Sequence, residues 1–231
     1  MALPIHKITV VNSSGLNNKG YGIFSGKPAV KGSGFISATQ VVWHKLEPVH
    51  NNQQDSFEYS SSFYAFVGSS GAQSLTLETD KTSISLRDKY VIAALAKDNG
   101  RGTDVKVEQS LVLSADTQAN GLPEASFTMA VASLAPQQPN FYVIGVARDL
   151  VRNHSVARVQ PIAAVQLKRA TKVTFTPSKT VIIAVTDLHV GDTKTDQFDS
   201  DAMAVVEFPG DIREAVVTEK DDGSFKVEYL P

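Results

Sequence analysis

A chain of 231 residues that is 42% hydrophobic and 20% charged has the composition of a globular protein, unlike that of a disordered segment. Its formal net charge of −2 excludes the basic surface that binding to a nucleic-acid backbone requires. Cysteine is absent, which excludes disulfides and thiolate chemistry and favours a reducing, cytoplasmic location.

The first residues lack the apolar segment of a secretion signal, and no stretch is long enough to span a membrane, so we expect no membrane partner. All-β chains of this length commonly form one domain, and no internal repeat or linker divides this one. The sequence therefore predicts a single domain over residues 1–231.

Alternation of apolar and polar residues predicts strands throughout the first half of the chain. The predicted strands cover residues 5–11, 21–25, 39–46 and 57–67, with two shorter strands around 75–77 and 84–86. Residues 87–97 fit either a helix or a strand over 90–95, and the strand is favoured because strands flank it on both sides.

The second half of the chain continues this pattern over residues 104–114, 126–132, 141–147, 181–185, 215–219 and 225–229. Two of these runs, 141–147 and 181–185, are apolar on both faces, as central strands covered on two sides are. The last two form a hairpin with Gly223 at its turn. The sequence predicts an all-β fold of two packed antiparallel sheets, a jelly-roll-like β-sandwich, with a closed β-barrel as the alternative.

The first candidate site surrounds Trp43, the only tryptophan of the chain. Its ring could stack on a sugar or another flat ligand, or it could simply belong to the core. Nearby, His44 or His50 could form a catalytic acid–base pair with Glu47, whereas the simpler interpretation places His50 in a solvated loop.

A second candidate pair, Asp187 and His189, is spaced two residues apart, so both side chains share one face of a strand. A carboxylate–imidazole pair or two metal ligands have this spacing. Acidic residues follow as far as Asp201 and could hold calcium, but they lack the EF-hand pattern and are more simply a solvated loop. We predict no metal and no cofactor.

A third candidate is Arg148, which follows an apolar strand and could hold a carboxylate through two hydrogen bonds. The simpler interpretation is a surface ion pair with Asp149. Tyr59, Tyr64 and Tyr142 could complete an aromatic binding surface.

Residues 20–28 resemble a phosphate loop only superficially, because the glycine spacing is wrong and Pro28 replaces the required hydroxyl residue. The sequence also lacks G-x-S-x-G and H-E-x-x-H motifs. Nucleotide-dependent enzymes, serine hydrolases and zinc proteases of these types are therefore disfavoured.

Six segments occur in an order that resembles a group of small fungal β-sandwich proteins without a secretion signal. They are ITVVNSSG (8–15), YGIFSGKP (21–28), VW (42–43), FYAFVG (63–68), FYVIG (141–145) and VTFTP (173–177). The resemblance implies a cytosolic all-β protein, and since some of those proteins accompany natural-product biosynthesis it would suit a cofactor-free cyclase or isomerase. It carries over no catalytic residue.

Three functions fit these observations. The favoured one is binding of a small apolar molecule or, in a lectin-like manner, of a glycan, through Trp43, the three tyrosines and Arg148. The second is a cofactor-free, pericyclase-like enzyme that uses His44, Glu47, Asp187 and His189. The third is a structural protein in which an exposed apolar sheet face builds a homo-oligomer.

Overall fold

The computed structural model describes residues 4–32, 38–70, 90–97, 103–107, 113–116, 125–131, 141–166, 172–194, 198 and 202–231. The elements in these ranges are β-strands, arranged in three open sheets, so the predicted all-β sandwich is confirmed and the sheets do not close as the alternative required. The described residues contain no helix that is long and apolar enough to cross a membrane.

The largest sheet has ten strands, and eight of them follow the order β16-β4-β13-β12-β6-β1-β18-β19 while β7 and β8 join it at β12. Their bounds are β1 (Ile5–Asn12), β4 (Thr39–Val41), β6 (Gln54–Ser60), β7 (Phe63–Ser70), β8 (Tyr90–Lys97), β12 (Phe141–Arg152), β13 (Ser155–Gln166), β16 (Thr193–Lys194), β18 (Glu214–Glu219) and β19 (Phe225–Leu230). The favoured strand at 90–95 is thus confirmed as β8.

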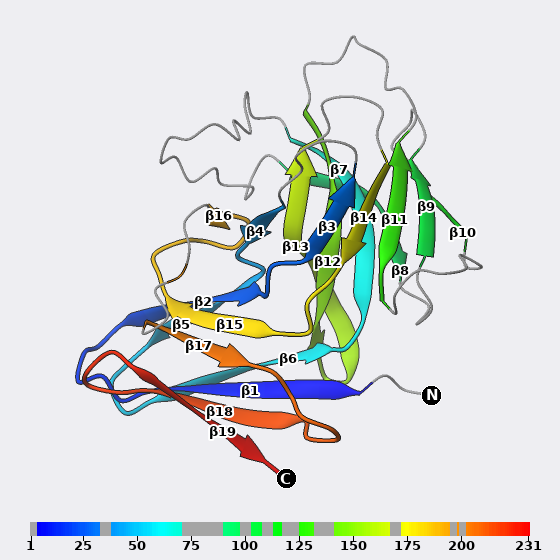
Figure 1. The fold of residues 1–231 in the computed structure, drawn as a ribbon. Helices are drawn as coiled ribbons and strands as arrows, with labels where there is room; N and C mark the ends of the chain where they lie inside the picture. The colour runs from blue at the N-terminus through cyan, green and yellow to red at the C-terminus, as the bar shows by residue number, and fades with distance from the viewer. Residues whose placement is uncertain are drawn as a thin grey trace.

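Two smaller sheets pack on this large one. The four-stranded sheet contains β17 (Met203–Val206), β15 (Val181–Val185), β2 (Lys19–Ser25) and β5 (His44–Val49) in that order. The five-stranded sheet contains β10 (Leu113–Asp116), β9 (Thr103–Val107), β11 (Phe127–Val131), β14 (Lys172–Thr176) and β3 (Ala29–Gly32). Figure 1 shows β1, β6 and β18 running in a clearly different direction from β7, β11 and β14.

One hydrophobic core joins the three sheets, because residues from all of them belong to the same buried cluster. Ile8 of β1 and Ile183 of β15 lie in this core together with Phe127 of β11. The predicted central strands are covered on both faces: Ile183 faces this core, whereas Ile182 belongs to a smaller cluster on the opposite side.

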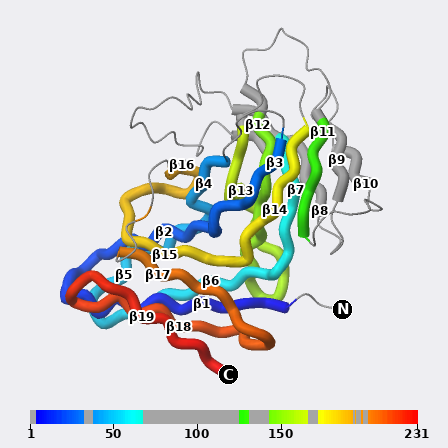
Figure 2. Tube along the Cα trace, viewed as in Figure 1, coloured from blue at the N-terminus to red at the C-terminus, as the bar shows by residue number. Residues whose placement is uncertain are grey.

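The N-terminal strand lies between two neighbours that are far away in the sequence. β1 pairs in antiparallel fashion with β6 and in parallel with β18, which continues into the predicted hairpin with β19. Figure 2 shows the blue N-terminal strand beside the red C-terminal hairpin. The turn of this hairpin contains Gly223 at φ 80, as the sequence predicted. A second parallel pair joins β9 and β11.

Three predicted strands each form two strands, so these three predictions were wrong. The run 104–114 forms β9 and β10, which pair with each other in antiparallel fashion. The run 57–67 forms β6 and β7, separated at Ser61 and Ser62, where the chain passes from the partner β1 to the partner β8. The run 39–46 forms β4 and β5, and the second of these continues through Pro48. Predicted strands at 75–77 and 84–86 lie outside the described residues.

The long hairpin formed by β12 and β13 carries two buried charged side chains, Arg148 and Asp149. Its register shifts twice, between Val146 and Ala147 and between Leu150 and Val151. Irregular pairing of this kind re-aims side chains locally. Arg148 and Asp149 lie between the two shifts, and both are buried although they point to opposite faces of the strand.

Candidate functional site

A buried cation lies at the centre of the aromatic part of the core. Arg148 comes from β12, and its guanidinium group lies against aromatic rings from three other segments of the chain. We call this group the Arg148 cluster, and its members are Arg148, His6 of β1, Trp43 between β4 and β5, Tyr59 of β6, Phe63 of β7 and Phe208 between β17 and β18.

Three aromatic rings contact the guanidinium group of Arg148, which is only 2% exposed. The guanidinium carbon lies 4.3 Å from the ring centroid of Tyr59, 4.9 Å from that of Phe63 and 5.9 Å from that of Trp43. Each such cation–π contact is worth about 0.5–2 kcal/mol. The rings therefore offset part of the cost of burying this charge.

Several nitrogen atoms of the cluster lack hydrogen-bond partners among the described residues. Nε and Nη1 of Arg148, Nε1 of Trp43 and Nδ1 of His6 are buried and have no hydrogen-bond partner within the described part of the chain. A buried polar group without a partner costs about 1–3 kcal/mol, and more when it is charged. Four such atoms in one cluster are an exception to the pairing seen throughout protein interiors.

The adjacent carboxylate does not neutralise Arg148 directly. Asp149 points to the opposite face of β12, where its oxygens accept hydrogen bonds from the Ser60 hydroxyl at 2.7 and 2.9 Å and from the Ser60 backbone N–H at 3.1 Å. The Tyr64 hydroxyl donates a longer bond to Asp149 at 3.4 Å. No ion pair joins Arg148 to a carboxylate among the described residues, so the surface pair with Asp149 considered from the sequence does not form.

Burial also determines the charge states in the cluster. It lowers the pKa of Arg148, an effect opposed by Tyr59 and Asp149. Burial raises the pKa of Tyr59 to about 12, although Arg148 acts in the opposite direction. Burial, Arg213 and Arg148 together lower the pKa of His6 to about 4. At neutral pH His6 and Tyr59 are therefore uncharged.

A row of aromatic rings connects the cluster with the protein surface. The ring centroid of His6 lies 5.2 Å from that of Tyr59 and 4.7 Å from that of Phe208. Phe208 is half-buried, and its centroid lies 5.9 Å from that of Tyr229, which is 36% exposed. Phe208 is therefore a half-buried member of the cluster that lies next to an exposed ring.

The structure brings three of the predicted binding residues together, namely Trp43, Tyr59 and Arg148. Tyr64 lies on the opposite face of the large sheet in a separate small cluster. The backbone of Tyr142 belongs to β12, but its side chain is outside the described part of the structure.

None of the residues predicted for catalysis belongs to this cluster, although His44 directly follows Trp43 and contacts the same Phe57 ring as Trp43 does. His44 is half-buried, its ring centroid is 5.4 Å from that of Phe57, and burial lowers its pKa. Glu47 is exposed, and no hydrogen bond or ion pair joins it to His44 within the described residues.

The second predicted pair is exposed. Asp187 forms no ion pair within the described ranges, whereas Nδ1 of His189 lies 3.7 Å from Oδ2 of Asp192. The backbone N–H of His189 donates to the same oxygen at 2.7 Å, so Asp192 orders this turn. The described residues contain no group of three or more potential metal ligands, and Asp196, Asp199 and Asp201 lie outside them.

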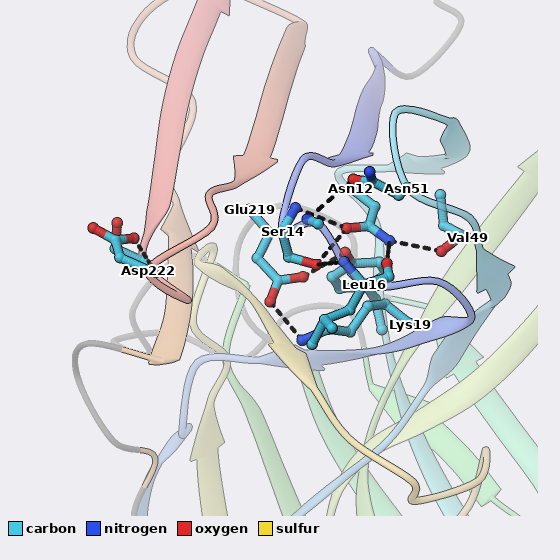
Figure 3. Close-up of polar contacts among 11 residues, drawn as sticks. Asn12, Ser14, Leu16, Lys19, Val49, Asn51, Glu219 and Asp222 are labelled. Atoms are coloured by element: carbon cyan, nitrogen blue, oxygen red, sulfur yellow. Dashed lines mark hydrogen bonds and ion pairs between the residues drawn. The ribbon is translucent and has the colours of Figure 1, made fainter.

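A second buried polar group has a different character, because its hydrogen bonding is complete. The Asn12 amide donates to the backbone oxygens of Leu16 and Val49 at 2.8 Å, and its oxygen accepts from Ser14 (Figure 3). Glu219 accepts from Lys19 at 2.9 Å and from the Tyr21 hydroxyl at 2.6 Å. The Asn12 contacts join β1 to β5, and the Glu219 contacts join β18 to β2, which explains both residues as structural.

Three members of the Arg148 cluster were missed from the sequence: His6, Phe63 and Phe208. Only His6 carried a signal, because it occupies an inward position of the alternating strand 5–11, where an apolar residue is expected. Phe63 resembles any core phenylalanine, and Phe208 lies in a connection without strand periodicity.

The fold and the cluster together define this chain as a β-sandwich protein with a buried, incompletely satisfied cationic centre. The chain belongs to the RhiA family, whose model matches residues 4–230. This match gives no indication of a fungal origin. Neither the curated proteins nor the solved structures contain a significant match to the chain.

Proposed function

We propose that this RhiA-family protein binds a small, largely apolar molecule at the Arg148 cluster. The observation that carries the proposal is a set of four buried nitrogens that lie among aromatic rings and have no hydrogen-bond partner among the described residues. Ligand sites combine such apolar walls with a few convergent polar groups. A ligand that supplies hydrogen-bond partners would pair with these nitrogens, and the hydrogen bonds gained would favour its binding.

Binding is supported over catalysis by the positions of the candidate acids and bases. His44 and Glu47 form no contact with one another in the described structure, and Asp187 and His189 are exposed at a turn. General acid–base catalysis requires such groups to reach the same reacting atoms. An apolar ligand is favoured over a glycan because Trp43 is fully buried, whereas stacking on a sugar calls for an accessible ring.

The test uses the emission of Trp43, which is the only tryptophan and lies within the cluster. Two neutral probes, benzamide and octanamide, are titrated into the protein at neutral pH. We expect a saturable change in emission with at least one of them. Native mass spectrometry of the freshly purified protein should in addition show an excess mass that denaturation removes.

Two variants locate the site. Phe208→Ala removes a half-buried ring of the cluster, so the affinity for the probe should change several-fold. Tyr64→Phe alters a tyrosine on the opposite face of the sheet and should leave the affinity as in the wild type. The proposal is wrong if neither the amides nor the corresponding acids, benzoate and octanoate, change the emission and the purified protein carries no bound molecule.

A further inference from the structure

We infer that the molecule bound at the Arg148 cluster carries a carboxylate, which the Arg148 guanidinium holds. This inference rests on the proposed function and adds the chemical class of the ligand. A carboxylate on an aromatic ring and a carboxylate on an aliphatic chain are both compatible with it, since the charged group is the part that the site selects.

The first step concerns charge. Arg148 is 2% exposed, and it forms no ion pair within the described part of the chain. Asp149, its neighbour in sequence, is occupied on the other face of β12 by Ser60 and Tyr64. A buried cation is stabilised most by an anion in direct contact with it. Because the described residues supply none there, the charge balance of the site favours an anionic ligand.

The second step concerns hydrogen bonding. Nε and Nη1 of Arg148 and Nε1 of Trp43 can only donate, and all three are unpaired within the described residues. The surrounding Tyr59 and Phe63 rings attract the positive charge but offer no conventional acceptor to the N–H groups. A carboxylate has two acceptor oxygens and no donor, and it pairs with guanidinium through two parallel bonds.

The third step concerns the body of the ligand. From Arg148 the aromatic row passes Tyr59, His6 and Phe208 towards the exposed Tyr229. These rings offer apolar contact and, with His6 neutral, no second charge at neutral pH. The ligand is therefore expected to have one anionic end at Arg148 and an apolar remainder beside Phe208.

The experiment compares each acid with its own amide, which has nearly the same shape and no charge. Benzoate is paired with benzamide and octanoate with octanamide, and affinities are measured from Trp43 emission and by calorimetry at neutral pH. We expect at least one acid to bind about tenfold more tightly than its amide, a difference of about 1.4 kcal/mol. Arg148→Gln should remove this preference, while Arg152→Gln, at an exposed position of the same strand, should retain it.

Ionic strength provides a readout that does not depend on the folding of the Arg148 variant. A carboxylate held on a buried guanidinium is screened little by salt, so its affinity should stay nearly constant between 50 and 500 mM NaCl, whereas binding to exposed cations should weaken steeply. Equal affinities of acid and amide, or steep loss with salt, would overturn the inference and leave the proposed function standing. Binding of neither acids nor amides would overturn both.

Discussion

Two carboxylates of the C-terminal hairpin have similar partners and very different surroundings. Glu219 accepts a bond from Lys19 at 2.9 Å and Glu228 accepts one from Lys226 at 2.7 Å. The side chain of Glu219 is buried, and burial together with the bond to Glu219 raises the pKa of Tyr21, which therefore remains a donor. The Glu228 pair is largely exposed, so water competes with its contact.

Replacing each glutamate by glutamine separates the two environments. Glu219→Gln turns one acceptor oxygen into a donor that faces Lys19 or Tyr21, and we expect a loss of about 2 kcal/mol in the free energy of unfolding. Glu228→Gln should change it by less than about 0.5 kcal/mol. Urea unfolding curves of the two variants measure this difference, and equal midpoints would contradict the assignment of Glu219 as a structural centre.

His6 makes stability depend on pH. The pKa of His6 is about 4 in the folded protein and 6.5 in the unfolded chain, so between these pH values a proton binds to the unfolded chain and not to the folded one. Stability is therefore highest above about pH 6.5 and falls as the pH drops towards 4. We expect a loss on the order of 2 kcal/mol from this residue, since one pKa unit corresponds to about 1.4 kcal/mol and solvent screens part of it.

Two variants check this assignment by urea unfolding at pH 7 and pH 4.5. His6→Phe keeps an aromatic ring against Tyr59 and Phe208 but cannot titrate, so its stability should depend less on pH. His154→Gln, in the exposed turn between β12 and β13, should retain the wild-type dependence. An unchanged dependence in His6→Phe would show that other groups cause it.

At the scale of elements, the corner between β6 and β7 depends on a buried hydrogen-bonded group. The hydroxyl of Ser60, at the end of β6, donates to Asp149 of β12 and accepts from the backbone N–H of Ser62 at 3.1 Å. This contact holds the point at which the chain leaves the neighbour β1 and joins the neighbour β8. Both Ser60 and Asp149 are buried, so water cannot replace the bond.

Ser60→Ala should lower the free energy of unfolding by about 1.5–3 kcal/mol, because it removes a donor to a buried charged acceptor. Ser56→Ala makes the same change at an exposed position of the same strand and should cost less than about 0.5 kcal/mol. Thermal or urea unfolding measures both variants. If Ser60→Ala were as stable as Ser56→Ala, the corner would not depend on this bond.

Alternation was sufficient to predict β1 and β18, because one face of each strand is buried, and a continuous apolar run predicted β15, which is buried on both faces over most of its length. The alternation of β19 also predicted its strand, although only Phe225 and Val227 of that strand are half-buried.

Alternation did not reveal β13, because a proline such as Pro161 is unusual inside a strand. In the structure Pro161 pairs with Ala147 next to a register shift that leaves Ile162 unpaired, and irregular positions of this kind tolerate proline. The break at Ser61 and Ser62 could not be predicted either, because serine is compatible with an extended strand.

Across the whole molecule, the candidate site was predicted only in part. Trp43, Tyr59 and Arg148 were identified as binding residues by their chemistry, but their convergence follows from pairings between distant strands. His6 and Phe208 come from near opposite ends of the chain and meet because β1 pairs in parallel with β18. No local pattern specifies such a pairing, so the cluster could not be assembled from sequence alone.

The pairing of β1 with β18 has a consequence for biosynthesis. Lys7 pairs with Glu214, so roughly 200 residues must leave the ribosome between synthesis of the two strands. At about 5–20 residues per second this takes on the order of 10–40 s, during which the N-terminal strand of the nascent chain has an open edge. Among the described strands, the first is therefore the one to which chaperones that shield unpaired strands have the longest time to bind.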